Sequence, residues 1–196
     1  MVLKVITYPN KNLFMKSKPV ENFDENLHKF LDDLYDTMRA YDGIGISAIQ
    51  VDKPIRAMLV LIPRQSQDLD ENGEFIAEQF KEDLLEIINP QFIELEGEQI
   101  CKEGCLSVPD FYEDVKRAKS IKLKFFDRFG KEQILSADGL KAVCIQHEYD
   151  HLEGHLFIEK IGYTKRKKFD KDYKAKIKEL KAKSENQGFE WGKNKF

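Results

Sequence analysis

The 196-residue sequence has few of the features that mark secreted and membrane proteins. It contains only three cysteines, Cys101, Cys105 and Cys144, and this odd number argues against a disulfide framework. No run of about 18 apolar residues occurs, which argues against a membrane-spanning helix. The first residues, Met1 to Ile6, lack the apolar region and cleavage site of a signal peptide. We therefore expect a cytoplasmic protein whose thiols are buried, reactive or metal-binding.

The composition is that of a soluble globular protein, with 41% hydrophobic and 34% charged residues. This length supports one domain with a tail. The charge is unevenly distributed, because residues 160–196 contain 13 Lys or Arg against 5 Asp or Glu. That segment has a charge of +8, which leaves −11 for residues 1–159. The sequence predicts a domain over residues 1–163 and a lysine-rich helical extension over 164–196.

The extension has two interpretations. Four apolar residues at helical spacing predict a helix from Thr164 to about Lys183 with a thin apolar face: Phe169, Tyr173, Ile177 and Leu180. The lysines either form a solvated helical surface or contact an anionic partner such as RNA.

The stretch from Gln146 to His151 contains the pattern H-E-x-x-H. On a helix, this spacing places His147 and His151 on one face, where both imidazoles can bind one metal ion. Glu148 then lies beside the metal and suits a general base. Apolar residues at spacings of three and four predict a helix that begins at Gly139. The alternative is that both histidines belong to the core and are satisfied by hydrogen bonds.

A third ligand is available in the loop expected from Cys101 to Pro109. Cys101 and Cys105 are four residues apart, which is not the C-x-x-C spacing of a zinc knuckle, so one thiolate ligand is easier to defend than two. If Cys105 joins His147 and His151, the metal has three protein ligands and an open fourth position. That is the arrangement of catalytic sites.

Other segments follow recognisable periodicities. The sequence predicts a helix capped by Asp24 that ends near Tyr41, and an excursion over residues 63–83 with a hairpin near Asn72 and Gly73. Strands are expected at Val2–Ile6, Arg56–Ile62, Leu84–Ile88, Phe92–Glu96, Ile121–Phe125 and Glu132–Ser136, with a turn at Asn89 and Pro90 between the third and fourth.

The segment from Gly43 to Gln50 reads G-I-G-I-S-A-I-Q. Two glycines allow another backbone to approach closely, and the Gln50 amide can donate to an oxyanion. It is not a dinucleotide-binding fingerprint, because Ala48 occupies the position of the third glycine. By itself the segment favours a simple glycine turn.

Together, three stretches resemble the motifs of peptide deformylases. Gly43 to Gln50 is similar to G-x-G-x-A-A-x-Q, Glu103 to Ser107 matches E-G-C-L-S, and Gln146 to His151 matches Q-H-E-x-D-H. The resemblance extends to about Ile158. It implies an α+β fold in which antiparallel strands surround a central metal-binding helix that carries H-E-x-x-H. It also implies removal of the formyl group from the N-terminal formyl-methionine of new polypeptides.

The resemblance assigns roles to the motif residues. Cys105, His147 and His151 would hold a divalent metal, and Glu148 would take a proton from water and pass it to the departing amine. The side chain of Gln50 and the backbone N–H of Leu106 would stabilise the oxyanion.

Substrate-binding roles are assigned in the same way. Gly45 would let an extended peptide pair as an added strand, and Ile44 and Cys144 would line the methionine pocket. Glu103 would support a metal ligand, with Arg117 as its ion-pair partner.

The first motif departs from the family pattern at three positions. Ser47 stands where alanine is usual, Ile49 where proline is usual, and Ile46 where leucine is common. These changes affect the shape of the loop and not its named donors, so we expect them to alter substrate preference and rate more than chemistry.

The resemblance favours Fe²⁺, although Zn²⁺, Ni²⁺ or Co²⁺ suits the same ligands. The expected partners are N-formylmethionyl nascent peptides and, through the basic extension, the ribosome. Neither a membrane nor DNA is expected as a partner.

Two alternative functions share part of this pattern. A zinc peptidase also uses H-E-x-x-H, but one large class needs a further histidine where this sequence has Phe157. Another class takes a downstream glutamate as third ligand, and here Glu179 lies in the lysine-rich tail, which would form a poor metal site. A non-catalytic, ribosome-associated binding module would be expected to lack one of the catalytic groups, and Glu148, Gln50 and the ligands are all present.

Overall fold

The computed structural model describes residues 1–70, 72 and 75–186, and these fall in two compact units, Met1–Phe157 and Ile158–Phe196. The first unit contains two α-helices among its described residues, α1 (Glu25–Ala40) and α2 (Gly139–Leu152). Its strands are β1 (Gly45–Ser47), β2 (Ala57–Val60), β3 (Arg64–Leu69), β4 (Phe75–Glu78), β5 (Leu85–Glu96), β6 (Gln99–Cys105), β7 (Val108–Arg117), β8 (Ser120–Phe126) and β9 (Glu132–Asp138). Short 3₁₀ turns are η1 (Lys11–Phe14), η2 (Ala48–Val51), η3 (Lys81–Asp83) and η4 (Phe157–Glu159), the last of which spans the junction of the two units.

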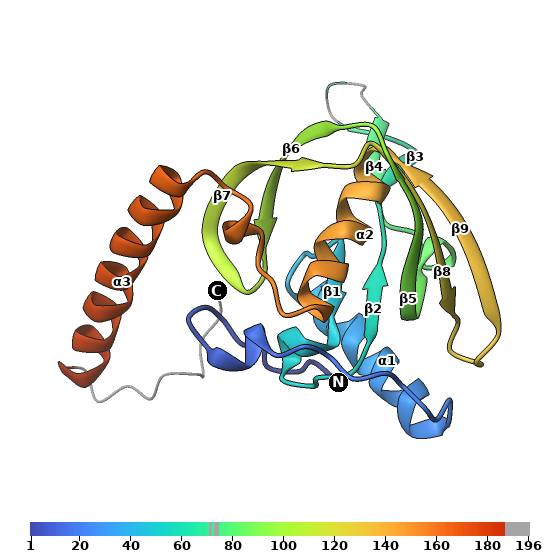
Figure 1. The fold of residues 1–196 in the computed structure, drawn as a ribbon, viewed down its shortest axis with the longest axis horizontal. Helices are drawn as coiled ribbons and strands as arrows, with labels where there is room; N and C mark the ends of the chain where they lie inside the picture. The colour runs from blue at the N-terminus through green and yellow to red at the C-terminus, as the bar shows by residue number, and fades with distance from the viewer. Residues whose placement is uncertain (71, 73–74, 187–196) are drawn as a thin grey trace. The chain divides into compact units, whose positions relative to one another are not determined.

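Five of these strands form one sheet in the order β1-β2-β5-β8-β9, with antiparallel pairing throughout. The hairpins β3–β4 and β6–β7 form separate two-stranded sheets. Figure 1 shows α2 between the five-stranded sheet and the β6–β7 hairpin. The structure therefore has the mixed α and β composition, with antiparallel sheets, that was predicted.

Helix α1 forms where its periodicity predicts it. The Asp24 carboxylate accepts hydrogen bonds from the backbone N–H groups of Asn26 and Leu27, which satisfies two donors at the start of the helix. The predicted apolar stripe is buried at Leu27, Leu31, Leu34 and Met38. This stripe packs against β1 and β2, and so supports the glycine-containing segment that leads into the site.

Helix α2 is buried over most of its length, including Val143, Cys144, Ile145, His147 and Glu148. It begins at Gly139, whose φ of +53° lies in the left-handed region that glycine adopts readily. Different residues of the helix therefore contact the sheet and the hairpin. Both of its histidines are buried.

Three local predictions were wrong. Val2 to Ile6 does not form a strand, because Leu3 and Ile6 donate their N–H groups to the Thr37 hydroxyl and the Gln50 carbonyl instead of to a strand partner. Asn89 does not end a strand, since β5 continues through it with a change of register between Ile88 and Gln91.

The third error concerns the segment that contains Cys105, which was treated as a loop. It forms the β6–β7 hairpin, whose pairing is irregular between Glu103 and Cys105. The hairpin predicted in the 63–83 excursion is β3–β4, and the residues of its turn lie partly outside those the structure describes.

The second unit contains α3 (Tyr163–Asn186), which covers the helix expected from Thr164 to about Lys183. On its expected apolar face Phe169 is buried and its ring lies 5.1 Å from that of Tyr173, whereas the side chains of Ile177 and Leu180 lie outside the described part. Within the described residues, no helix combines the length and the apolar character that crossing a bilayer requires.

Candidate metal centre and active site

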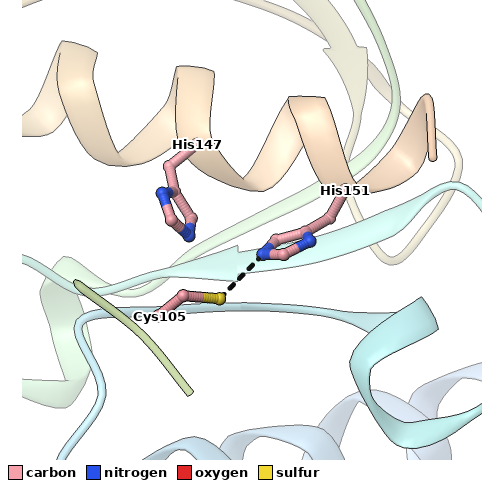
Figure 2. A group of neighbouring side chains, drawn as sticks. All are labelled: Cys105, His147 and His151. Carbon is pink, nitrogen blue, oxygen red and sulfur yellow. Dashed lines mark hydrogen bonds between the residues drawn. The ribbon is translucent and has the colours of Figure 1, made fainter. Parts of the chain in front are cut away.

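Cys105, His147 and His151 meet in one place, as Figure 2 shows. The histidines project from α2 toward Cys105, which lies at the end of β6. Their ligand atoms all lie within 4.8 Å of one another, and the Cys105 Sγ atom is 3.2 Å from His151 Nε2. His147 and His151 are 7% and 0% exposed. The spacing predicted from the sequence thus brings one thiol and two imidazoles together.

These donors fit a divalent metal. A tetrahedral ion with bonds of about 2.0 to 2.3 Å to nitrogen and sulfur separates its ligand atoms by roughly 3.3 to 3.6 Å, which is close to the separation of Cys105 and His151. Burial, together with positive charge from His147 and Arg117, lowers the pKa of His151 well below its ordinary value. The His151 ring is therefore neutral and offers a lone pair. Its Nδ1 atom is buried without a hydrogen-bond partner in the described chain.

Glu103 orients one of the two histidines. Its carboxylate lies 2.8 Å from His147 Nδ1, which leaves the Nε2 atom of His147 to face the other donors. Arg117 donates two hydrogen bonds to the same carboxylate, at 2.7 and 2.8 Å, and a third to Asp150. Burial alone would raise the pKa of Glu103, but the hydrogen bonds from Arg117 and His147 hold that pKa at about 2. The pairing of Glu103 with Arg117 predicted from the sequence is therefore present.

Glu148 is 3% exposed and follows His147 directly on α2. Burial raises its pKa, while His147 and a hydrogen bond from Ser47 act in the opposite direction. The carboxylate packs closely against Gly45, where an added Cβ would lie 2.7 Å from Oε1 of Glu148 and 2.6 Å from Sγ of Cys144. Only glycine therefore fits at position 45, because a side chain there would clash with Glu148 and Cys144.

The Gln50 side chain is oriented by Ser47, whose backbone N–H donates to Gln50 Oε1 at 2.8 Å. This contact turns the Nε2 atom of Gln50 to 3.5 Å from Cys105 Sγ and 3.3 Å from Ser107 Oγ. The amide donor predicted from the sequence is therefore beside the cluster of ligands.

The remaining predicted residues surround the same place. The thiol of Cys144 lies 3.5 Å from the carbonyl oxygen of Ile44, one residue before Gly45. Leu106 directly follows Cys105 and packs against the hydrophobic core cluster that includes Ile46 of β1. All eleven residues predicted from the sequence belong to the first unit.

A family model described as polypeptide deformylase matches residues 2–167. The chain belongs to this family. The peptide deformylase of Campylobacter jejuni is 58% identical over 182 residues, which cover 92% of this chain and 98% of the relative. That of Nautilia profundicola is 52% identical over 182 residues, covering 93% and 99%. The crystal structure of a peptide deformylase from Legionella pneumophila superposes with a TM-score of 0.78 at 35% identity, covering 93% of this chain and 98% of that one.

Peptide deformylases are metal-dependent hydrolases that remove the N-terminal formyl group from nascent polypeptides, and the chain is such an enzyme. These similarities do not favour a zinc peptidase or a non-catalytic binding module. Both alternatives considered from the sequence are therefore set aside.

Three further residues contact the site and were not identified from the sequence. Asp150 and Ser107 lie within the matched motifs, so their positions alone could have indicated a role. Ser47 was treated only as a departure that alters loop shape. Its contact with Glu148, 101 residues away in the chain, becomes visible only in the fold.

Proposed function

We propose that Cys105, His147 and His151 hold the catalytic metal and that Glu148 is the general base. The observation that supports this assignment is the meeting of one thiol and two buried imidazoles beside a buried carboxylate. When bound, a divalent metal ion supplies Lewis acidity, which lowers the pKa of water and polarises the formyl carbonyl.

Glu148 takes the proton of the attacking water and returns it to the departing amine. Its burial raises its pKa, which makes the carboxylate a stronger base than an exposed glutamate. The proton moves between groups in a site from which most water is excluded, because Glu148 and both histidines are buried.

Gln50 and Leu106 stabilise the oxyanion that develops on the formyl oxygen. The Gln50 amide is held with its nitrogen toward Cys105, so this donor needs no reorganisation during the reaction. The backbone N–H of Leu106, directly after Cys105, supplies the second donor. One such donor contributes about 2.7 to 4 kcal/mol of transition-state stabilisation.

The substrate binds as an added strand along β1. β1 stands at the edge of the five-stranded sheet, so a peptide can pair with its backbone at Gly45. Ile44 and Cys144 line the pocket for the methionine side chain. A peptide deformylase from Acinetobacter baumannii, with a TM-score of 0.72 and 30% identity, has been solved with Met-Ala-Ser bound, which supports peptide binding to this fold.

Glu103 and Arg117 support the metal ligands without touching substrate. The Glu103 carboxylate fixes the orientation of His147, and Arg117 compensates its charge. We propose Fe²⁺ as the native metal, with Zn²⁺, Ni²⁺ and Co²⁺ as ions that suit the same thiolate and imidazoles.

The division into a catalytic domain over 1–163 and a helical extension over 164–196 is part of the proposal, as is cytoplasmic action on nascent chains. The lysine-rich α3 is proposed to contact the ribosome, since its charge favours RNA. Membranes and DNA are not proposed as partners.

Formate release from a formyl-Met tripeptide tests the function. Protein prepared without oxygen and loaded with Fe²⁺ or Ni²⁺ is expected to release formate, and a chelator is expected to abolish the release. The acetylated tripeptide serves as the control. Glu148→Ala is expected to retain the metal but lose turnover, because only the base is removed.

Fully metal-loaded protein that releases no formate would contradict the proposed activity. Retained turnover in Glu148→Ala would remove Glu148 from the mechanism and leave the metal ligands untouched.

A further inference from the structure

Ser47 contacts two different groups of the active site. Its backbone N–H donates to Gln50 Oε1 at 2.8 Å, and its hydroxyl oxygen lies 2.5 Å from Glu148 Oε2 and 3.0 Å from the Glu148 carbonyl oxygen. The residue is 0% exposed. We propose that the Ser47 hydroxyl is a positioning group that fixes the carboxylate of Glu148. The inference rests on the proposed role of Glu148 as the base.

The hydroxyl has a single hydrogen and two acceptors within reach, the carboxylate and the carbonyl of Glu148. A hydrogen bond to an ionised carboxylate is roughly twice as strong as one between neutral groups. The carboxylate is therefore the preferred acceptor. In the part of the chain that the structure describes, no other side chain donates a hydrogen bond to this carboxylate.

The other side of the Glu148 side chain is limited by packing. Its Oε1 and Cγ atoms lie against Gly45, where an added Cβ would be 2.7 and 3.0 Å away. The carboxylate is thus in contact with the Gly45 backbone on one side and with the Ser47 hydroxyl on the other. Without the hydroxyl, rotation of the carboxylate is opposed by packing alone, and misplacing a catalytic group lowers the rate of the chemical step.

The contacts made by Ser47 can be separated by one substitution. Ser47→Ala keeps the N–H that donates to the Gln50 side chain and removes the hydroxyl, which contacts Glu148 and also faces the Gln50 backbone in a capping box. The Gln50 amide therefore keeps the hydrogen bond that orients its side chain, whereas the base loses its own. A change in kcat with an unchanged KM is the expected signature of such a positioning group.

The test measures kcat and KM of Ser47→Ala with metal-loaded protein and a formyl-Met tripeptide, together with metal content and Tm. We expect kcat to fall about tenfold, as the loss of one hydrogen bond to a charged group predicts, with KM and metal content unchanged. The Tm shows that the variant remains folded at the assay temperature. Ser17→Ala is the matched control, because Ser17 is a buried serine whose hydroxyl has no partner within the described residues. Its kinetic constants are expected to equal those of the wild type.

A second measurement separates positioning from a general structural effect. In a Glu148→Asp background the shorter side chain draws the carboxylate away from the hydroxyl, so Ser47→Ala is expected to lower the remaining rate much less than tenfold. An equal fall in both backgrounds, an unchanged kcat in Ser47→Ala, or a raised KM with kcat preserved would each overturn the proposal. Failure of the proposed function gives a different result, namely no chelator-sensitive formate release from the wild type.

Discussion

At the scale of single residues, the site depends on how buried charges are compensated. Arg117 is 4% exposed, yet its guanidinium is surrounded by acceptors, since it bonds both oxygens of Glu103 and one of Asp150. Burial opposes its charge, but these two carboxylates raise the pKa of Arg117 above its ordinary value. The same Glu103 oxygen that bonds Arg117 Nη2 also lies against His147. One guanidinium therefore stabilises, through Glu103, the orientation of His147, which is a proposed metal ligand.

We predict that Arg117→Met lowers the free energy of unfolding by about 3 to 5 kcal/mol, because it leaves two carboxylates without their buried partner. Metal affinity is expected to fall about 10- to 100-fold, since Glu103 is no longer held against His147. Denaturant unfolding and metal titration measure the two effects.

Arg128→Met is the matched control for this prediction. Arg128 also bonds two carboxylates, Glu86 and Asp32, but it lies nearer the surface and away from the predicted ligands. The substitution is expected to lower the free energy of unfolding by about 1 kcal/mol or less and to leave metal affinity unchanged. Equal losses in both variants would contradict the special role of Arg117.

At the scale of elements, the β3–β4 excursion is attached to the segment that opens the site. Gln79, just after β4, donates from Nε2 to the carbonyl oxygens of Gly43 at 3.0 Å and of Leu61 at 2.7 Å. Gly43 directly precedes Ile44, and the Ile44 carbonyl accepts from the N–H of Leu61. The excursion therefore braces the backbone beside the predicted methionine pocket.

We predict that Gln79→Ala raises KM for a formyl-Met tripeptide about threefold to tenfold and lowers stability by about 1 to 2 kcal/mol, because two carbonyl groups lose their donor. Gln99→Ala is the control. The Gln99 amide also donates to backbone carbonyls, those of Ala118, Lys119 and Gly139, but none of them adjoins the predicted pocket. A KM that rises equally in both variants would argue against a specific brace.

Periodicity predicted the elements that have one apolar, more buried face and one polar, more exposed face. Helix α1 and the β8–β9 hairpin follow their apolar patterns, because each has one buried and one exposed side. The ligand residues predicted from motif types and spacing also lie together in the structure. The pattern could not show that the extended segment at Val2–Ile6 bonds to Thr37 and Gln50 and not to a strand.

Contacts between distant segments account for the rest of what was missed. Strand β6 exposes Ile100 and buries Glu103, so its sequence shows no apolar alternation that would indicate a strand. The hydrogen bond between Ser47 and Glu148 joins residues 101 positions apart. No local pattern reports such a pair, and only the packing of β1 against α2 creates it.

At the scale of the whole molecule, two units with opposite charge occur in one chain. The family match ends at residue 167, just after α3 begins at Tyr163, so most of the lysine-rich helix lies beyond it. Several lysines of α3 are exposed to solvent: Lys167, Lys168, Lys171 and Lys178. These exposed charges agree with the proposed contact between α3 and ribosomal RNA.

We predict that replacing these four lysines by glutamate weakens co-sedimentation with ribosomes at least about tenfold at moderate salt, because phosphate contacts dominate such binding. Formate release from a free tripeptide is expected to be unchanged. In the control, four exposed lysines of the first unit are replaced by glutamate: Lys11, Lys29, Lys53 and Lys131. Equal loss of co-sedimentation in both variants would indicate general charge attraction and contradict a role for α3.

The shortness of β1 has a consequence for how the protein behaves at high concentration. An edge strand that pairs with a peptide substrate can also pair with the edge of another sheet, which is a common origin of aggregation. β1 has only three residues, Gly45–Ser47, and it passes directly into the turn η2. It is long enough to align a peptide end but too short to recruit a second sheet. The strand that is proposed to bind nascent chains therefore offers little edge for association between copies of the enzyme.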